Sequence, residues 1–437
     1  MIHFDQARRE CVVSLLKLCD TEAAIERAVL IDDLFGKIRV VAWLKGDDTS
    51  KLRARIEAAL SEAGGAFWSN DLWTPTGKKD LDSTVYEAAW EQGDEVSPKL
   101  RRADRYRSKG FWLNPPADPA WPEPTPPVVA FYSFKGGVGR TTAVASFAIQ
   151  RARAGERVVV LDFDLEAPGI GTLLDPGEGI PGASWGVLDY LLERPVLEKA
   201  PDLRDYYHAC AREKVTGSGE ILVVPAGQTN SDFLAKLSRV DLEPAVPDHK
   251  HPLLILLEQV RDDLRPDWIL LDCRAGISEA AGFVLSGLPH LSVLFGTASE
   301  QSWLGLHIVL ERMGAERVRR GLPQLECLLV HAMVPDEPIR AMAETDFSSR
   351  SADEFTGCYY ASNPDDPDED ELWYVRDMEN EFAPHLPASI PYKSRLAFVK
   401  RIDDVADALA DDPDYRNLAE QIASRFYGPV ETEESES

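Results

Sequence analysis

The clearest hydrophobic pattern in the chain is a series of short, almost continuous apolar runs. They cover residues 128–133, 157–163, 268–272, 291–297 and 325–331. Runs of this kind are typical of parallel strands that are covered on both faces of a sheet. The amphipathic segments between them, such as the one that begins at Thr142, predict helices. We therefore expect an α/β fold over residues 128–427, with a doubly wound, mainly parallel sheet and helices on both of its faces.

The first 113 residues follow a different pattern. Apolar residues recur at helical spacing over residues 4–28 and 51–63, and residues 28–44 have the pattern of a hairpin that turns at Gly36. These segments predict a small α+β module at residues 1–113. We expect core packing for most of its tryptophans, with a docking surface as the alternative. They are Trp68, Trp73, Trp90 and Trp112.

Prolines and acidic residues mark three irregular segments. Residues 114–127 are rich in proline and predict a stiff, extended linker between the module and the larger domain. Residues 335–387 interrupt the strand rhythm and contain a run of carboxylates at 363–371, so we expect an acidic surface insertion, with a docking or lid element as the alternative. Residues 428–437 form an acidic tail.

The composition is that of a large globular protein. The chain has 437 residues, and 44% of them are hydrophobic, which is enough for the cores of two or three domains. No apolar stretch approaches the ~18 residues that cross a bilayer, and the first residues lack the features of a signal peptide, so we expect a cytoplasmic location. The six cysteines form neither a CxxC pair nor a Cys/His cluster in the sequence, which argues against structural zinc and a disulfide framework.

The net charge of −27 limits the expected partners. Binding to DNA phosphates needs clustered arginines and lysines, and in this chain they are scattered. The acidic tail would be repelled by anionic lipids. Binding to DNA and to membranes is therefore disfavoured.

A glycine-rich segment follows the first apolar run. Residues 134–142 are Phe-Lys-Gly-Gly-Val-Gly-Arg-Thr-Thr, and the glycines allow successive backbone N–H groups to turn toward an anion at the start of the next helix. This pattern predicts a phosphate-binding loop. Its candidate nucleotide-binding residues are Lys135, Gly136, Gly137, Val138, Gly139, Arg140, Thr141 and Thr142.

Acidic residues lie at the ends of two other apolar runs. Asp162 and Asp164 are at the end of the run at 157–163, and Asp272 ends the run at 268–272. In an open α/β sheet, ligands bind at the carboxyl ends of the strands. The sequence therefore predicts that these carboxylates lie beside the bound phosphates.

The segment 134–142 has a lysine ahead of its glycine pair. In this it resembles the deviant Walker A loop of the MinD/ParA group of P-loop ATPases, and more narrowly the loop of the KGGVGR variants. The resemblance covers residues 128 to about 425. It implies ATP and Mg²⁺ as cofactors, with Thr141, Asp162 and Asp272 in the magnesium shell. It also implies that Asp164 is catalytic and orients the attacking water.

The same resemblance assigns roles to four other positions. Lys135 would be catalytic and would reach the nucleotide of a partner subunit across a homodimer, while Arg140 replaces the usual lysine and would hold phosphate within its own subunit. Because arginine is a planar fork rather than a point charge, hydrolysis would be slow or lost. Gly276 would belong to the switch segment that begins at Asp272, and His331 would stand where an asparagine commonly contacts adenine.

Residues 390–396, which include Pro391, resemble the loop that closes over the base. The preference for adenine over other bases stays open. We expect an ATPase that acts as a nucleotide-controlled dimeric switch for a protein partner, and the resemblance associates it with bacterial signalling or conflict systems. Two alternatives stay open: an ATP-binding scaffold or sensor without useful turnover, and a P-loop kinase or ligase-like enzyme.

Overall fold

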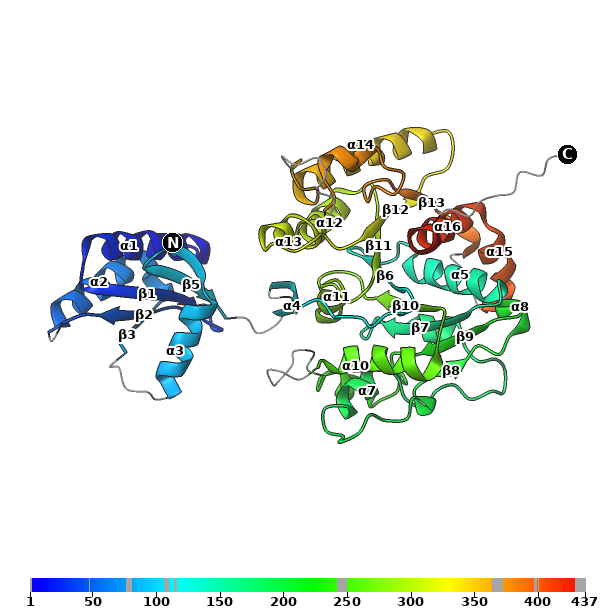
Figure 1. Cartoon of the computed structure of the whole chain (residues 1–437), viewed down its shortest axis with the longest axis horizontal. Coiled ribbons are helices and arrows are strands. Elements are labelled where there is room, and N and C mark those ends of the chain that lie inside the picture. The colour runs from blue at the N-terminus through cyan, green and yellow to red at the C-terminus, as the bar shows by residue number, and fades with distance from the viewer. Residues whose placement is uncertain are drawn as a thin grey trace. The chain divides into compact units, whose positions relative to one another are not determined.

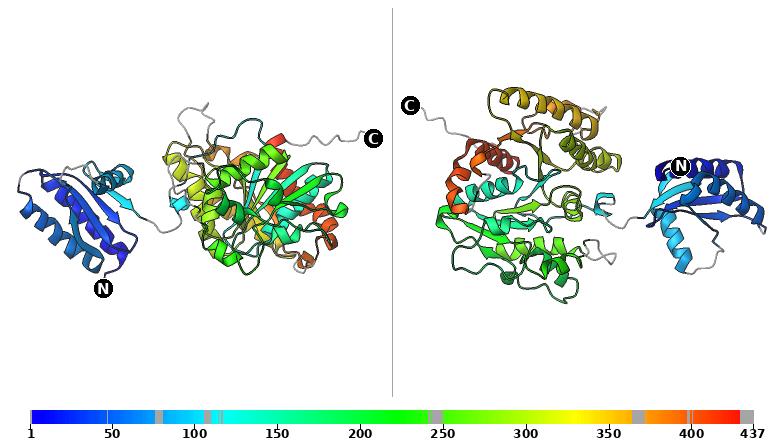
Figure 2. Two further views of the ribbon diagram at one scale, coloured as in Figure 1. Left: turned by 90° about the horizontal axis from the view of Figure 1, so that it is seen from below. Right: turned by 180° about the vertical axis from the view of Figure 1, so that it is seen from behind.

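The computed structural model describes residues 2–46, 48–75, 81–105, 110–113, 115, 117–240, 242, 250–363, 372–396, 399 and 401–428. The chain divides into two compact units, Met1–Ser108 and Lys109–Ser437. The elements of each unit can be followed in Figures 1 and 2. Within the described ranges, no helix combines the length and hydropathy that a bilayer crossing needs.

The N-terminal unit contains one five-stranded sheet with the strand order β3-β2-β1-β5-β4. Its strands are β1 (Ile25–Asp32), β2 (Ile38–Leu44), β3 (Trp68–Trp73), β4 (Asp94–Ser97) and β5 (Leu100–Asp104). The hairpin of β1 and β2 is antiparallel, whereas β1 and β5 run parallel. Helices α1 (Phe4–Thr21) and α2 (Ser50–Gly64) pack on one face of the sheet, and α3 (Leu81–Gln92) packs on the other. Residues 22–28, predicted as the end of the first helix, instead lead into and begin β1.

The C-terminal unit is built on an eight-stranded sheet with the order β13-β12-β11-β6-β10-β7-β9-β8. The strands are β6 (Val128–Ser133), β7 (Arg157–Phe163), β8 (His208–Ala209), β9 (Glu220–Val224), β10 (Trp268–Cys273), β11 (Leu291–Gly296), β12 (Cys327–Val334) and β13 (Ala388–Pro391). All neighbouring pairs are parallel except β8 with β9. The predicted α/β fold, a mainly parallel P-loop sheet preceded by a small α+β unit, is confirmed.

Two apolar cores lie on opposite faces of this sheet. One core contains residues of α4 (Gly110–Leu113), α7 (Val187–Glu193), α10 (Pro252–Gln259), α11 (Glu279–Val284), α12 (Glu300–Met313) and α14 (Arg340–Cys358). The other contains residues of α5 (Arg140–Arg153), α6 (Ile170–Leu173), α8 (Glu213–Thr216), α15 (Ala406–Asp411) and α16 (Pro413–Tyr427). The central strands are thus covered on both sides, as their unbroken apolar runs require.

The junction between the units differs from the predicted linker at residues 114–127. The division falls after Ser108, and Trp112 is buried in the C-terminal unit, where its indole N–H donates to the carbonyl of Ser278 at 2.6 Å. Farther along, the indole N–H of Trp121 donates to the carbonyl of Leu288 at 3.1 Å. The proline-rich segment therefore packs on the C-terminal unit, because its few aromatic and charged side chains find partners there.

The predicted irregular insertion at residues 335–387 contains a helix of 19 residues, α14. Phe347, Ser351 and Phe355 are buried along it at a spacing of four residues, which is a helical period. The prolines at both ends of the segment obscured this pattern in the sequence. Most of the acidic run at 363–371 and the tail at 429–437 lie outside the described residues.

Candidate functional site

The glycine loop joins the end of β6 to the start of α5. Gly137 and Gly139 have φ values of +75° and +88°, a region that glycine enters without strain, and Gly139 immediately precedes the first turn of α5. A cavity of about 600 Å³ opens above the loop and is lined by residues 136–142. Backbone N–H groups at the start of α5 thus face a space that accommodates an anion.

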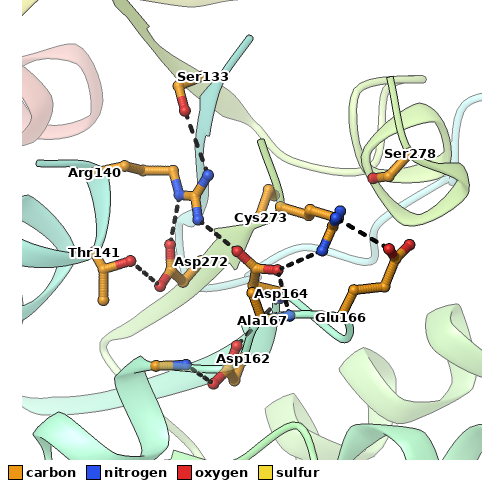
Figure 3. Close-up of polar contacts among 12 residues, drawn as sticks. Ser133, Arg140, Thr141, Asp162, Asp164, Glu166, Ala167, Asp272, Cys273 and Ser278 are labelled. Carbon is orange, nitrogen blue, oxygen red and sulfur yellow. Dashed lines mark hydrogen bonds and ion pairs between the residues drawn. The ribbon is translucent and has the colours of Figure 1, made fainter. Parts of the chain in front are cut away.

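Arg140 is buried at the bottom of this cavity among polar side chains from three strand ends (Figure 3). Its Nε donates to Asp272 at 2.8 Å, and one terminal nitrogen donates to Asp164 at 3.1 Å. The other terminal nitrogen lies 3.4 Å from the hydroxyl of Ser133. The guanidinium therefore serves as the counter-ion of two carboxylates that the sequence analysis assigned to metal and water.

Thr141 and Asp272 are joined by a hydrogen bond, in which the threonine hydroxyl donates to the second carboxylate oxygen at 2.8 Å. Asp162 lies on the neighbouring strand, because β7 and β10 pair with Asp162 opposite Asp272. Its carboxylate accepts hydrogen bonds from the backbone N–H groups of Asp164 and Gly169, each at 3.1 Å. Burial, and then the charge of Asp272, raise the pKa of Asp162 to about 7.

This donor set fits a magnesium ion. Thr141, Asp162 and Asp272 offer hydroxyl and carboxylate oxygens, the ligands that Mg²⁺ prefers. Asp162 and Asp272 are each 1% exposed, and holding two buried carboxylates near one another is unfavourable without positive charge. A bound cation would remove that penalty.

Asp164 and Arg274 are two further charged residues that line the cavity. Arg274 follows β10 directly, and its guanidinium lies 3.4 Å from Asp164 and 3.0 Å from Glu166. The sequence analysis did not select Arg274, although a cation between Asp272 and Gly276 was a visible signal. Gly276 has a φ of +77° and donates its N–H to the carbonyl of Ser133 at 3.0 Å, which ties this segment to the end of β6.

Five predicted site residues are not part of the cavity lining, namely Lys135, Asp162, Asp272, Gly276 and His331. Lys135 is exposed, and among the described residues its ammonium group has no hydrogen-bonding or ion-pairing partner. His331 is 1% exposed and stacks on Phe347 with the ring centroids 3.9 Å apart. Burial lowers the pKa of His331 to about 4, so its ring is neutral at pH 7. The base contact predicted for His331 stays a prediction, and in this structure the ring is buried against Phe347 and does not line the cavity.

The wall at the other end of the cavity is mainly apolar. Met333 lines it in place of His331 and has a φ of +59° beside the irregular step in the pairing of β12 with β13. Pro391 lines it, together with four further residues of the 390–396 segment and one residue of α16 that the sequence analysis left unassigned. These are Ile390, Tyr392, Lys393, Leu396 and Tyr415. An apolar slot beside a phosphate loop has the character of a site for a planar base.

The chain resembles known proteins over part of its length. Residues 129–338 match the CobQ/CobB/MinD/ParA nucleotide binding domain. The chain contains a nucleotide-binding domain of the MinD/ParA group. The deviant form of its Walker A loop stays an assignment from the sequence.

Individual relatives resemble parts of the chain. An uncharacterized ATP-binding protein of Methanocaldococcus jannaschii is 27% identical over 234 residues, which are 49% of this chain and 77% of that protein. The septum site-determining protein MinD of Synechocystis is 26% identical over 175 residues, 40% of this chain and 54% of that protein. The solved structure of MinD complexed with Mg-ADP from Pyrococcus horikoshii has 16% identity and a TM-score of 0.41, and the match covers 68% of this chain and 95% of that one.

Proposed function

We propose that the C-terminal unit binds Mg-ATP, hydrolyses it slowly and uses the difference between the two nucleotide states to control a dimer that a protein partner recognises. The observation that carries this proposal is the hydrogen bond between Thr141, in the first turn after the glycine loop, and Asp272. It joins the loop hydroxyl to the carboxylate at the end of β10, the pair that would hold the metal beside the phosphates.

The chain supplies four kinds of groups for this reaction. The loop N–H groups and the start of α5 would bind the phosphates, and Thr141, Asp162 and Asp272 would hold magnesium. Bound magnesium neutralises charge on the phosphate oxygens. The apolar slot around Met333 and Pro391 would hold the base.

Asp164 is the residue that we assign to the attacking water. It lines the cavity, and the N–H of Ala167 donates to one of its oxygens at 3.1 Å, which orients the carboxylate. A carboxylate in this position can accept a proton from water as the bond to the terminal phosphorus forms. Arg140 also forms an ion pair with this carboxylate, at 3.1 Å.

Lys135 would act between two subunits. Its exposure leaves the ammonium group available to a partner's nucleotide, where a cation stabilises charge on the transferring phosphoryl group. The expected absence of DNA and membrane binding rests on the net charge of −27, the scattered arginines and lysines and the acidic tail, and it stays a prediction, as does the cytoplasmic location. A role beside effector proteins in bacterial signalling or conflict systems rests on family association.

A nucleotide sensor without useful turnover is the second candidate. It is favoured by the burial of Arg140, which is 8% exposed and pairs with both Asp164 and Asp272. A guanidinium held by these carboxylates would compete with the metal and the water for them. Turnover would then be slow even where binding is tight.

Replacing Asp164 with alanine separates binding from hydrolysis. We expect Asp164→Ala to keep ATP affinity within several-fold and to lose phosphate release, as measured by calorimetry and a phosphate assay. Asp353→Ala, which removes an exposed carboxylate of α14, is the control and should leave both unchanged. A folded Asp164→Ala protein that no longer binds nucleotide would refute the assignment, and a wild type that binds without turnover would favour the sensor.

A further inference from the structure

Arg274 is a cavity-lining cation that the proposed binding scheme leaves unused. It lies on the segment that follows β10, and it lines the same cavity as Gly136 and Gly137 of the phosphate loop. Its side chain is 31% exposed, so the guanidinium is free to change its partners. A second cation beside the phosphate loop calls for an explanation in a site that already contains Arg140.

The two arginines differ in how firmly they are held. Arg140 has an exposed fraction of 8%, and its two carboxylate partners, Asp272 and Asp164, are themselves 1% and 13% exposed. Moving it away would leave the buried Asp272 carboxylate without a counter-ion, which is strongly unfavourable. Arg140 is therefore expected to keep these partners.

Arg274 has weaker ties. Its contact with Asp164 is 3.4 Å long, and its contact with Glu166 involves a carboxylate that is 53% exposed. Solvent-exposed ion pairs of this kind contribute little free energy. A phosphate group carries more charge than one carboxylate and binds arginine through two parallel hydrogen bonds, so it can compete successfully for this guanidinium.

We propose that Arg274 recognises the terminal phosphate of a nucleoside triphosphate and so distinguishes the triphosphate from the diphosphate. In the absence of that phosphate, Arg274 pairs with Asp164 and Glu166, as in the structure. Its transfer to the phosphate frees one oxygen of Asp164 for water. Arg274 thus links recognition of the terminal phosphate to exposure of the residue assigned to the attacking water.

This inference rests on the proposed function, and the test distinguishes the two. A non-hydrolysable ATP analogue and ADP are titrated into wild type, Arg274→Ala and Arg274→Lys, with magnesium present. We expect Arg274→Ala to weaken binding of the triphosphate by about tenfold, which is the usual contribution of a charged hydrogen bond. The affinity for ADP should change less than twofold. Arg274→Lys, which retains the charge, should lose less affinity for the triphosphate than Arg274→Ala. Wild type that binds neither nucleotide would overturn the proposed function itself.

Glu166→Gln provides an effect of opposite sign. Removing this competing carboxylate should increase the affinity for the triphosphate about threefold, as expected for the loss of an exposed ion pair. The affinity for ADP should not change. Arg319→Ala is the matched control for loss of one positive charge, because Arg319 is 61% exposed and lies on α13 (Ala315–Arg319). The inference would be overturned if Arg274→Ala lost the same affinity for both nucleotides. It would also be overturned if the variant had wild-type thermal stability and lost no affinity for the triphosphate.

Discussion

The ring of Phe134 lies against Gly305, so closely that a Cβ added to this glycine would be 1.9 Å from the ring. Phe134 occupies the first position of the phosphate loop, where the usual motif has glycine, and Gly305 lies in α12. The contact couples the loop to a helix that exposes Leu304 and Ile308 at 68% and 43%. Phe134 replaces the first glycine of the motif, and the absence of a side chain at Gly305 leaves room for its ring.

Gly305→Ala should disturb the phosphate loop. The added methyl group overlaps the Phe134 ring, and overpacking of this kind costs about 1–3 kcal/mol of the free energy of unfolding. We also expect weaker ATP binding, since the ring can yield only by moving the loop. Urea unfolding and calorimetry measure the two effects.

Gly357→Ala is the control for this substitution, because Gly357 is also a helical glycine but has nothing within 4 Å of an added Cβ. It should be neutral or stabilising. The effect of Gly305→Ala should shrink in a Phe134→Ala background. Equal costs with and without the ring would show that the contact is unimportant.

Arg140→Ala should destabilise the C-terminal unit and make it sensitive to magnesium. Removing the guanidinium leaves Asp272 without a counter-ion and Asp164 with Arg274 alone, at a cost of about 3 kcal/mol. The same loss frees the Asp272 carboxylate for a cation, so magnesium alone should raise the urea midpoint of Arg140→Ala more than that of wild type. Arg140→Lys should show smaller changes and keep nucleotide binding.

Arg317→Ala is the matched control, because Arg317 is another buried arginine of the same unit and pairs with Asp118. It should also lose stability, but magnesium should not restore it. If magnesium acts equally on both variants, the carboxylates beside Arg140 are not the metal ligands.

Dimerisation should depend on ATP and on Lys135. The hydrolysis-blocked Asp164→Ala protein is expected to be dimeric with Mg-ATP and monomeric with ADP, and adding Lys135→Ala should abolish the dimer while most nucleotide binding remains. Light scattering after size exclusion measures the mass. Lys199→Ala replaces another exposed lysine and should leave the dimer intact. A mass that never changes with nucleotide would contradict the switch.

The N-terminal unit should lose stability as the pH rises from about 4 to about 7. Asp32 on β1 lies opposite Asp104 on β5, and burial, followed by the hydrogen bond with the Asp104 carboxyl, raises the pKa of Asp32 to about 7 despite Arg102 and Arg8 nearby. The folded state then holds a proton that the unfolded state releases near pH 4, so stability falls across this interval, by about 4 kcal/mol.

Asp32→Asn should remove most of this pH dependence, because the amide resembles the protonated acid. Hydrogen exchange of β1 peptides in the full chain, corrected for the intrinsic effect of pH, reports the opening free energy. Asp20→Asn, which changes an exposed carboxylate of α1, should keep the wild-type slope. A flat profile in wild type would disprove the raised pKa.

Local pattern alone was sufficient for the central sheet and for bringing several candidate site residues to one edge of it. Strands covered on both faces must be apolar along their whole length, so β6, β7 and β10 are visible as unbroken runs. Their carboxyl ends meet at one edge because they are parallel, which brings Thr141, Asp162 and Asp272 together. The glycines of the loop reflect a backbone requirement that is itself local.

Side-chain direction and long-range contacts depended on the tertiary structure. Whether His331 or Met333 faces the cavity depends on the irregular pairing of β12 with β13 and on the stacking of His331 against Phe347, which lies on α14. The partners of Arg140 and Arg274 come from other strands, and Trp112 belongs to the C-terminal unit because its indole finds Ser278 there. Sequence spacing carries no information about such contacts, since they form only when distant segments have packed.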